Sequence, residues 1–419
     1  MSTQYIKEFL DGFNEIGRTS KGMNRIAFTK SENEAKSLFK EICNNAGLSI
    51  KEDEIGNVIA RREGEDPLLP PVTTGSHLDT VTNGGEYDGT TGIVSALEVV
   101  RRLNSKKIKT HHPIEIICFT AEESSRFGIS TIGSKFLTGK LKINQMKDIT
   151  DKSGVTLKDA LEEIGKSVDK IKSAQKQSKS FQSFFEVHIE QGPLLERNQK
   201  DIGVISGIAS PTRYEVVIEG KASHSGTTPM NLRSDAFLGA AEMSLAIDKA
   251  AKKEVVEGTV ATVGDCVVSP GAMNVVPERA KIKIDIRGVN SRSKLEVSNE
   301  IKKTAEKLKN EKKLKVFINL IMEDKPVNLD KNIIESIKKT CNTLNISFQN
   351  MVSGAGHDSM HMSDICPTGL IFIPCKDGLS HHKEEFTSLD SIKIGCDVLE
   401  QEIIKSAKMI NEERKAMEE

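Results

Sequence analysis

Short apolar segments alternate with helical segments along the first part of the chain, from residue 1 to about residue 206. Residues 114–119 are apolar except for one glutamate, so they are expected to form a strand buried on both faces. Residues 92–103 carry apolar side chains at helical spacing. Strands that alternate with helices predict an α/β fold with a mainly parallel sheet.

The pattern changes between residues 209 and 325, where the expected order of elements is β-α-β-β-α-β. The stretch "AKIKIDIRG" alternates strictly between apolar and charged residues, as a strand with one buried face does. This order is that of a split ferredoxin-like unit. Because 419 residues exceed one ordinary core, we expect an α/β domain of residues 1–208 and 326–419 with an inserted lid domain of residues 209–325.

The composition excludes several classes of protein. Hydrophobic residues make up 37% of the chain, charged residues 28%, and the net charge is −1, which offers nothing to attract a nucleic acid. No apolar run approaches the roughly 20 residues that span a bilayer. The seven cysteines are scattered and include no C-x-x-C pair, which fits reduced thiols. The first residues lack the basic and apolar regions of a signal peptide. These features predict a cytoplasmic protein without a nucleic-acid or membrane partner.

Two adjacent glutamates, Glu122 and Glu123, follow the buried strand of residues 114–119. Two like charges side by side cost stability unless a cation or protonation relieves them. Neighbouring side chains cannot both point at the same spot, so one carboxylate can bind a metal ion while the other acts as a base. Two surface glutamates that open a helix are the plain alternative.

Histidines stand at the other predicted strand ends. Of the nine in the chain, His77, His188, His224 and His381 have glycine-rich or acidic surroundings next to such ends, which is where sites form in open α/β sheets. In "GSHLDTVTNGGEYDGTTG", Asp79 is close enough to hydrogen-bond the imidazole of His77 and fix its tautomer. The glycines would let Asp88 fold back to the same cation.

Three histidines, one aspartate and one glutamate at strand ends provide nitrogen and oxygen ligands. That set suits zinc, manganese or cobalt, and its size suits two divalent metal ions. A general base beside such a site is what hydrolysis at neutral pH requires.

The motifs together resemble the M20 metallopeptidase superfamily, and more closely its hydantoinase/carbamoylase amidase branch. They are "GSHLDTVTNGGEYDGTTG", "EESSRF", "HIEQGP", "KASHSGTTPMNLRSDA", "GAMNVVPERAKIKIDIR", "SGAGHDS" and "GLSHHKEE", in the order that this family has them. The resemblance implies that Asp88 bridges two metal ions. It implies that His77 and His188 complete one site, and Glu123 and His381 the other.

The same resemblance implies roles around the metal ions. Glu122 would be the general base acting on a bridging water, and Gln191 would contact the substrate amide. In the lid, His224 would stabilise the oxyanion, in its own or the partner subunit. Asn274 would hold the substrate, and Arg287 would pair with the substrate carboxylate. The lid would also form a homodimer.

Two positions depart from the family's pattern, which usually has glycine where Ser124 stands and "SHSPEE" where this chain has "SHHKEE". His382 therefore competes with His381 as a ligand, and His381 is preferred because it directly follows the serine. His357, in "GAGHDS", is either a substrate contact or a structural histidine.

The function expected from these residues is hydrolysis of the ureido C–N bond of N-carbamoyl-L-amino acids, which yields the amino acid, ammonia and carbon dioxide. The substrate would be a small ureido carboxylate, and the resemblance leaves allantoate amidohydrolase and β-ureidopropionase as alternatives. Two further alternatives are a dipeptidase or aminoacylase of the same superfamily and a binding protein without catalysis.

Overall fold

The computed structural model describes residues 3–141, 146, 148–166 and 180–408. The chain divides into two compact units. Unit 1 comprises residues 1–206, 329–351 and 356–419, and unit 2 comprises residues 207–328 and 352–355. Within the described residues, no helix combines the length and the apolar character that crossing a membrane would need.

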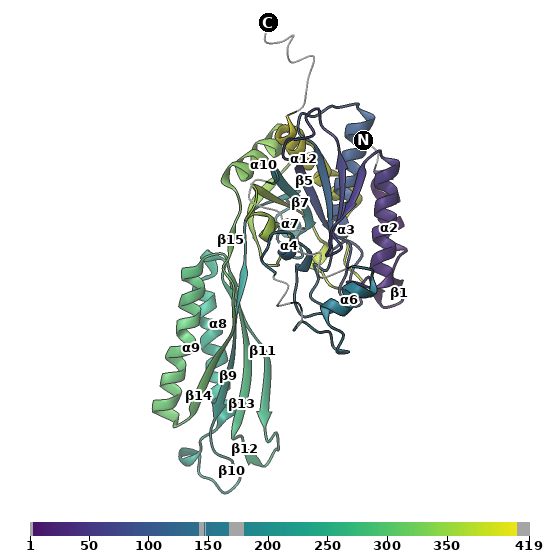
Figure 1. Ribbon diagram of the computed structural model, residues 1–419. Coiled ribbons are helices and arrows are strands. Elements are labelled where there is room, and N and C mark those ends of the chain that lie inside the picture. Colours follow the sequence, from purple (N-terminus) through teal and green to yellow (C-terminus); the bar gives the residue numbers. More distant parts are fainter. Residues whose placement is uncertain (1–2, 142–145, 147, 167–179, 409–419) are drawn as a thin grey trace. The chain divides into compact units, whose positions relative to one another are not determined.

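Unit 1 is built around a large sheet in the order β8-β17-β7-β5-β6-β4-β3, with β16 paired to β8. Figure 1 shows β5 and β7 of this sheet among the helices of the unit. The strands of unit 1 are β1 (Arg18–Thr19), β2 (Gly22–Met23), β3 (Ser49–Glu52), β4 (Val58–Arg62), β5 (Val72–His77), β6 (Ile114–Phe119), β7 (Ser183–Ile189), β8 (Ile202–Ile208), β16 (Phe348–Ser353) and β17 (Thr368–Ile373). Unit 1 thus also holds a separate two-stranded sheet of β1 and β2. Its helices are α1 (Gln4–Asn14), α2 (Lys30–Asn45), α3 (Thr90–Ser105), α4 (Ile132–Leu137), α6 (Leu157–Glu163), α7 (Leu194–Arg197), α10 (Lys331–Thr343), α11 (Ser359–Met362), η4 (Lys376–Gly378) and α12 (Leu389–Ala407).

The sheet is mixed rather than mainly parallel. The four central strands β17, β7, β5 and β6 are parallel, but β4 and β3 on one side and β8 on the other are antiparallel to their neighbours. A tight turn joins β3 to β4, with the Asp53 carboxylate accepting hydrogen bonds from the amides of Ile55, Gly56 and Asn57. Short connections of this kind suit antiparallel neighbours, whereas parallel strands need long crossovers.

Helices cover both faces of the central strands. On β7, Phe184 packs in a cluster with Met362 of α11, while Val187 on the opposite face lies against Gly395 of α12. Every residue of β5, β6, β7 and β17 is buried. This double cover explains why β6 and β17 are almost entirely apolar in sequence. It also leaves the strand ends as the places where polar side chains can gather.

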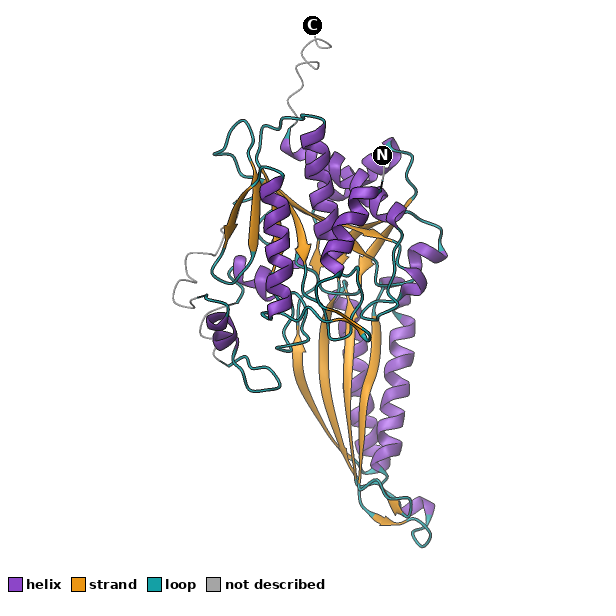
Figure 2. Ribbon diagram, turned by 90° about the vertical axis from the view of Figure 1, so that its right-hand side faces the viewer, coloured by secondary structure: helices purple, strands orange, loops and turns teal. Residues whose placement is uncertain are grey.

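Unit 2 contains a four-stranded antiparallel sheet in the order β11-β13-β9-β14, and Figure 2 shows two long helices along one side of its strands. Its elements are β9 (Ser210–Glu219), β10 (Ser223–His224), η2 (Met230–Leu232), α8 (Ala236–Lys253), η3 (Val255–Glu257), β11 (Val260–Ser269), β12 (Val275–Val276), β13 (Arg279–Gly288), α9 (Ser291–Lys312), β14 (Lys315–Glu323) and β15 (Val327–Asn328).

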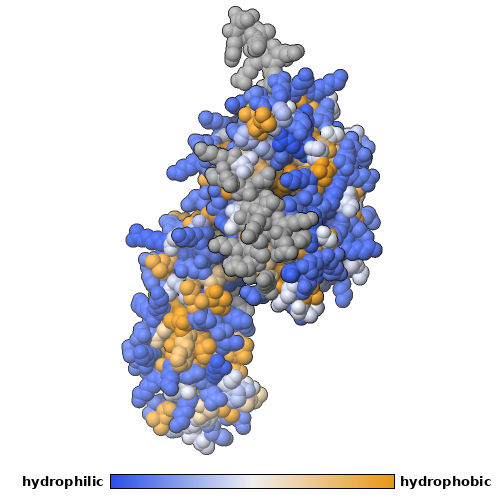
Figure 3. All heavy atoms as spheres, viewed as in Figure 1, coloured by the Kyte–Doolittle hydropathy of each residue, from blue (hydrophilic) through white to orange (hydrophobic). Residues whose placement is uncertain are grey.

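One face of the unit 2 sheet is packed against α8 and α9. The apolar residues of "AKIKIDIRG", namely Ala280, Ile282, Ile284 and Ile286, are buried in this core. The other face is more exposed and carries cross-strand ion pairs such as Lys283–Asp265. Large apolar side chains also lie exposed on its strands, including Val267 and Phe317, and hydrophobic surface is visible on this unit in Figure 3.

Candidate active site

The site in unit 1 lies where parallel strands end. His77 is the last residue of β5, Glu122 and Glu123 follow β6, and His188 is near the end of β7. Because the carboxyl ends of neighbouring parallel strands meet at one edge of a sheet, these side chains converge. The segment after β17 brings His381 to the same place.

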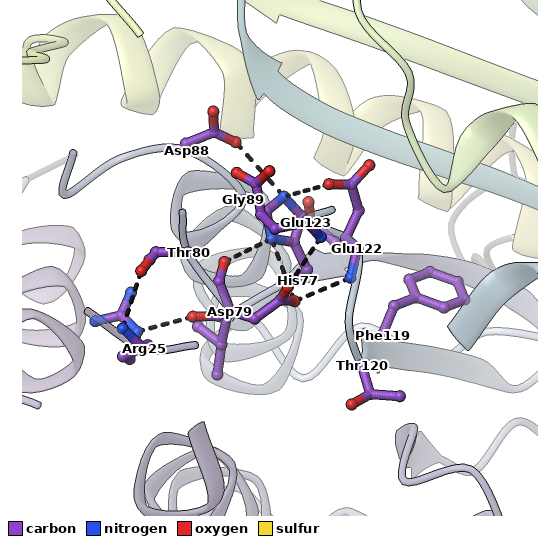
Figure 4. Close-up of polar contacts among 12 residues, drawn as sticks. Arg25, His77, Asp79, Thr80, Asp88, Gly89, Phe119, Thr120, Glu122 and Glu123 are labelled. Carbon is purple, nitrogen blue, oxygen red and sulfur yellow. Dashed lines mark hydrogen bonds and ion pairs between the residues drawn. The ribbon is translucent and has the colours of Figure 1, made fainter. Parts of the chain in front are cut away.

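One group of candidate metal ligands consists of His77, Asp88 and His188, all buried, with ligand atoms within 4.8 Å of one another. The Oδ1 atom of Asp88 lies 3.5 Å from His77 Nε2 and 3.1 Å from His188 Nε2. Figure 4 shows His77 and Asp88 turned toward each other. Two imidazoles and one carboxylate thus face a common point.

A second group consists of Asp88, Glu123 and His381, again within 4.8 Å of one another. Here the other carboxylate oxygen of Asp88, Oδ2, lies 3.4 Å from His381 Nε2, and Glu123 Oε1 lies 3.3 Å from the same nitrogen. Asp88 is therefore shared between the two groups. His382 belongs to neither of these ligand groups. It is exposed, and its Nδ1 accepts a hydrogen bond from the backbone N–H of Glu384, 3.2 Å away.

The tautomers of the two buried histidines are set by backbone carbonyls. His77 Nδ1 lies 2.9 Å from the carbonyl oxygen of Asp79, and His188 Nδ1 lies 2.9 Å from that of Ile189. Donation from Nδ1 leaves each Nε2 as a ligand aimed at Asp88. The sequence had suggested that the Asp79 carboxylate would hold His77. The structure gives that bond to the Asp79 carbonyl, because the carboxylate is used elsewhere.

The Asp79 carboxylate fixes the glutamate pair instead. Its two oxygens accept hydrogen bonds from the backbone N–H groups of Glu122 and Glu123, at 3.1 and 2.9 Å (Figure 4). Ala121, just before the pair, has a positive φ of 50°, so the chain turns sharply at the strand end. This turn separates the two side chains, with Glu123 near His381 and Glu122 Oε2 at 3.8 Å from His77 Nε2.

Glu385 is a part of the site that the sequence interpretation missed. Its Oε1 accepts hydrogen bonds from the backbone N–H groups of Tyr87 and Asp88, both at 2.9 Å, and its Oε2 accepts from that of His381 at 3.2 Å. One buried carboxylate thus ties the Asp88 loop to the His381 loop. The acidic pair that ends "SHHKEE" is the sequence signal that could have identified it.

Gln191 contacts Asp88 directly. Its side-chain amide donates to Asp88 Oδ2 at 2.6 Å and to Ser380 Oγ at 3.3 Å. Gln191 Oε1 is buried and has no hydrogen-bond partner among the described residues. The amide therefore orients the shared carboxylate and keeps one acceptor unused.

His357 lies behind the first group, where it forms a third cluster of possible ligands with Glu186 and His188. Its ring packs against that of His188 with centroids 4.6 Å apart, and it is also near Phe372. Burial, followed by the neighbouring His188, holds the pKa of His357 well below its usual value, so the ring stays neutral. This position favours a supporting role over an exposed substrate contact.

The remaining three predicted site residues, His224, Asn274 and Arg287, belong to unit 2. His224 Nδ1 accepts hydrogen bonds from the backbone N–H groups of Gly226 and Thr227, at 3.0 and 3.3 Å. Arg287 donates from Nε and Nη2 to the two oxygens of Asp285, and from Nη1 to the carbonyl of Gly354. Asn274 is exposed.

The electrostatics of unit 1 indicate a site made for cations. Burial alone would lower the pKa of His77, yet the carboxylates of Asp88, Glu122 and Asp79 raise it well above its usual value. Contacts with Asp88 and Glu123 raise the pKa of His381 to about 11. Burial, followed by the charge of Glu123, raises the pKa of Glu122. A cluster that draws in protons this strongly offers the same negative field to divalent metal ions.

The residues present fit two metal ions. Each group has nitrogen and oxygen donors, Asp88 presents a different oxygen to each, and backbone carbonyls hold both buried imidazoles in the ligating tautomer. Divalent cations would also relieve the repulsion between the buried carboxylates, which otherwise only protonation or the charge of the histidines can relieve.

Gly89 is required next to this site. Its φ is +64°, and a Cβ atom there would lie 2.4 Å from the ring of His77. We expect Gly89→Ala to destabilise the protein by about 1–3 kcal/mol through backbone strain and to displace His77, so that metal is lost as well. Gly128→Ala is the matched control, since φ is +71° there and a Cβ would meet nothing within 4 Å. Urea unfolding and metal content measure the two effects; equal metal content in the two variants would contradict the clash.

Comparison with known proteins identifies the family of the chain. Residues 73–405 match the family model "Peptidase family M20/M25/M40". The chain is 36% identical over 408 residues to an N-carbamoyl-L-amino-acid amidohydrolase of Pseudomonas sp. (strain NS671), covering 97% of this chain and 98% of the relative. It is also 36% identical over 392 residues to a ureidoglycolate hydrolase of Arabidopsis thaliana, covering 92% and 82%.

A solved structure gives the same result. The hydantoinase/carbamoylase family amidase from Burkholderia multivorans superposes with a TM-score of 0.91 at 30% identity, covering 97% of this chain and 98% of that one. The chain therefore belongs to peptidase family M20/M25/M40 and, within it, to the amidases of the hydantoinase/carbamoylase type.

Proposed function

We propose that this enzyme is a metal-dependent amidohydrolase that cleaves the ureido C–N bond of N-carbamoyl-L-amino acids. The observation that carries this proposal is the sharing of Asp88 between two ligand groups, with Glu122 at their edge. The first group would hold one divalent cation through His77 and His188, and the second would hold another through Glu123 and His381. Zinc, manganese and cobalt all accept these donors.

Two cations held there would polarise the substrate carbonyl and lower the pKa of a water molecule. Glu122 is the base that takes the proton from the attacking water, because its carboxylate faces the site without belonging to either ligand group. Its raised pKa suits proton transfer near neutral pH better than that of an ordinary carboxylate. Glu122 then returns the proton to the departing nitrogen. Asp79 supports this by holding the amides of both glutamates.

Gln191 would bind the ureido group. Its Oε1 is the buried acceptor that lacks a partner within the described part of the chain, and a substrate N–H would satisfy it. Its amide nitrogen stays on Asp88, so substrate binding and the orientation of the shared ligand are joined in one side chain.

His224 would stabilise the developing oxyanion. Backbone N–H groups donate to its Nδ1, so the ring proton must be on Nε2, and His224 offers an N–H donor. We expect His224→Ala to lower kcat by about 10²–10³, the usual effect of losing one oxyanion donor, with metal content unchanged. His111→Ala, a histidine in unit 1 outside the ligand groups, is the control. Wild-type kcat in His224→Ala would remove His224 from the mechanism.

Arg287 would bind the substrate carboxylate, and Asn274 would help to hold the substrate. In this structure the guanidinium of Arg287 already makes a two-point contact with the Asp285 carboxylate, the geometry that arginine uses for carboxylates in general. A substrate carboxylate would take the place of the Asp285 carboxylate at Arg287. Asp285 would keep its ion pair with Arg213, whose Nε lies 3.2 Å from Asp285 Oδ2.

Unit 2 would serve as lid and dimerisation domain. The support is that large apolar side chains of this unit, such as Val267, Phe317 and Met273, are exposed, and contact with a second copy would cover them. Sedimentation velocity of the purified enzyme tests whether it is a homodimer. The same measurement on a Phe317→Glu variant tests whether the exposed apolar side chains form the dimer interface, in which case the variant should be monomeric.

The reaction itself is tested by ammonia release from N-carbamoyl-L-amino acids, β-ureidopropionate, allantoate and ureidoglycolate. Chelator-treated enzyme should be inactive and should regain turnover with added manganese, zinc or cobalt. Highest kcat/KM on an N-carbamoyl-L-amino acid supports the proposal. The second candidate is ureidoglycolate, because the Arabidopsis ureidoglycolate hydrolase has the same 36% identity to this chain as the Pseudomonas amidohydrolase, over a somewhat shorter alignment. A preference for ureidoglycolate would replace the proposal. Two bound metals without turnover on any ureido compound would contradict both.

A further inference from the structure

Arg25 is a fully buried arginine directly behind the metal-ligand loop. Its relative exposure is 0%, and Figure 4 shows it on the side of Asp79 away from the other carboxylates. Nothing in the reaction proposed above uses this residue. Burying a guanidinium destabilises the folded state unless its charge and its five N–H groups find partners. The partners of Arg25 therefore indicate its role.

The hydrogen bonds of the guanidinium reach three different elements. Nε donates to the carbonyl of Leu78 at 2.8 Å, and Nη2 donates to Thr90 Oγ1 at 2.7 Å. Nη1 donates to the carbonyls of Phe13 and Ile16, at 2.6 and 3.2 Å. One planar group thus joins the end of β5, the start of α3 and the end of α1.

Two of these partners enclose the loop that carries the shared ligand. Leu78 directly follows the ligand His77, and Thr90 stands two residues after the ligand Asp88. The loop between them is also held by the backbone. Arg25 N–H donates to Thr80 Oγ1 at 2.9 Å, and the Thr80 N–H donates back to the Arg25 carbonyl at 2.9 Å.

The charge of Arg25 has a place in the site as well. The carbonyls of Phe13 and Ile16 form the negative end of α1, which favours a cation. Burial lowers the pKa of Arg25 to about 10, and the attraction of Asp79 for the guanidinium opposes this effect. At neutral pH the guanidinium therefore remains charged. Its positive charge therefore lies beside a cluster of buried carboxylates that would otherwise repel one another.

We propose that Arg25 is a positioning residue of the metal site, which holds the loop of residues 78–90 so that His77 and Asp88 converge on one cation. The inference rests on the metal site proposed above. It predicts that loss of Arg25 weakens metal binding more than the loss of folding stability alone would. The ligand residues are unchanged in such a variant, but they no longer point at one cation.

The test compares Arg25→Met with Arg102→Met. Arg102 is an arginine of similar burial on α3 that is paired with Glu98 and Glu400, outside the ligand groups. Metal affinity is measured by competition with a chromogenic chelator, and unfolding by urea on metal-free protein. We expect Arg25→Met to raise the metal Kd by about 10–100-fold, as loss of a residue behind metal ligands does. Arg102→Met should lower stability without changing the metal Kd.

Two milder variants keep the test decisive if Arg25→Met does not fold. Arg25→Lys retains the charge but cannot reach Leu78, Phe13 and Thr90 together. Its metal Kd should therefore also rise, by about tenfold or more. Thr90→Val removes one hydrogen bond in a side chain of equal size and should raise the Kd about fivefold. Wild-type metal affinity in folded Arg25→Met or in Thr90→Val, or an equal loss in Arg102→Met, would overturn the inference.

The outcome for Arg25 is separable from that of the proposed reaction. Wild-type enzyme that binds two metal ions but hydrolyses no ureido compound overturns the reaction and leaves the role of Arg25 to be judged by metal affinity alone. Wild-type enzyme that binds no divalent metal overturns both.

Discussion

Glu122→Gln is expected to lower kcat by about 10²–10⁴, the range for losing a general base, while both metal ions remain bound. Glutamine has nearly the same shape but cannot accept the proton of the attacking water. Glu122 belongs to neither ligand group, and its backbone N–H is held by Asp79 irrespective of the side chain. The loss should therefore appear in kcat, with little change in metal content or KM.

The matched control is Glu384→Gln. It makes the same chemical change at an exposed glutamate in the loop that carries His381, so it reports any effect of altering charge near the site. Metal content by mass spectrometry and steady-state kinetics on the best ureido substrate give the comparison. A Glu122→Gln enzyme with wild-type kcat would show that another group moves the proton, and loss of metal in that variant would make Glu122 a ligand instead.

The parts of the site that could be predicted from the sequence are those whose chemistry is local. A histidine or glutamate directly after an apolar strand must lie at the edge of the sheet, so His77, Glu122 and Glu123 could be placed at strand ends before their distances were known. The strict alternation of residues 279–288 likewise fixed which side chains of β13 are buried. Both are consequences of strand geometry alone.

The parts that escaped prediction depend on contacts far apart in the sequence. Glu385 reaches the amide of Asp88 across 297 residues, and Arg25 reaches Leu78 across 53. No periodicity connects such partners. The antiparallel pair β3 and β4 was missed. The edge strand β3 is short and half-exposed, and such a segment has a weak pattern. Even for Asp79 the residue was right, but only the structure shows that its carbonyl rather than its carboxylate holds His77.

Asp88→Asn tests whether a single carboxylate is shared by two cations. Asp88 Oδ1 faces the first ligand group and Oδ2 the second, so an amide at this position removes the charge that both groups share. An asparagine also turns an NH₂ donor toward one of them, where it would repel a cation. We expect metal content to fall from two ions per chain to one or none, and ureido hydrolysis to be lost with it.

The thermal stability of the same variant gives a second, independent readout. A ligand that binds the folded state at 100 times its Kd stabilises it by about 2.7 kcal/mol per site, so added metal should raise the Tm of the wild-type enzyme and have little effect on Asp88→Asn. Asp377→Asn is the control, because it makes the same change at an exposed residue with φ of 55°, a backbone conformation that asparagine tolerates. Two metal ions and a full metal-induced Tm shift in Asp88→Asn would mean that the two groups do not share this ligand. Any cations would then have to be held by Glu123 and the histidines alone.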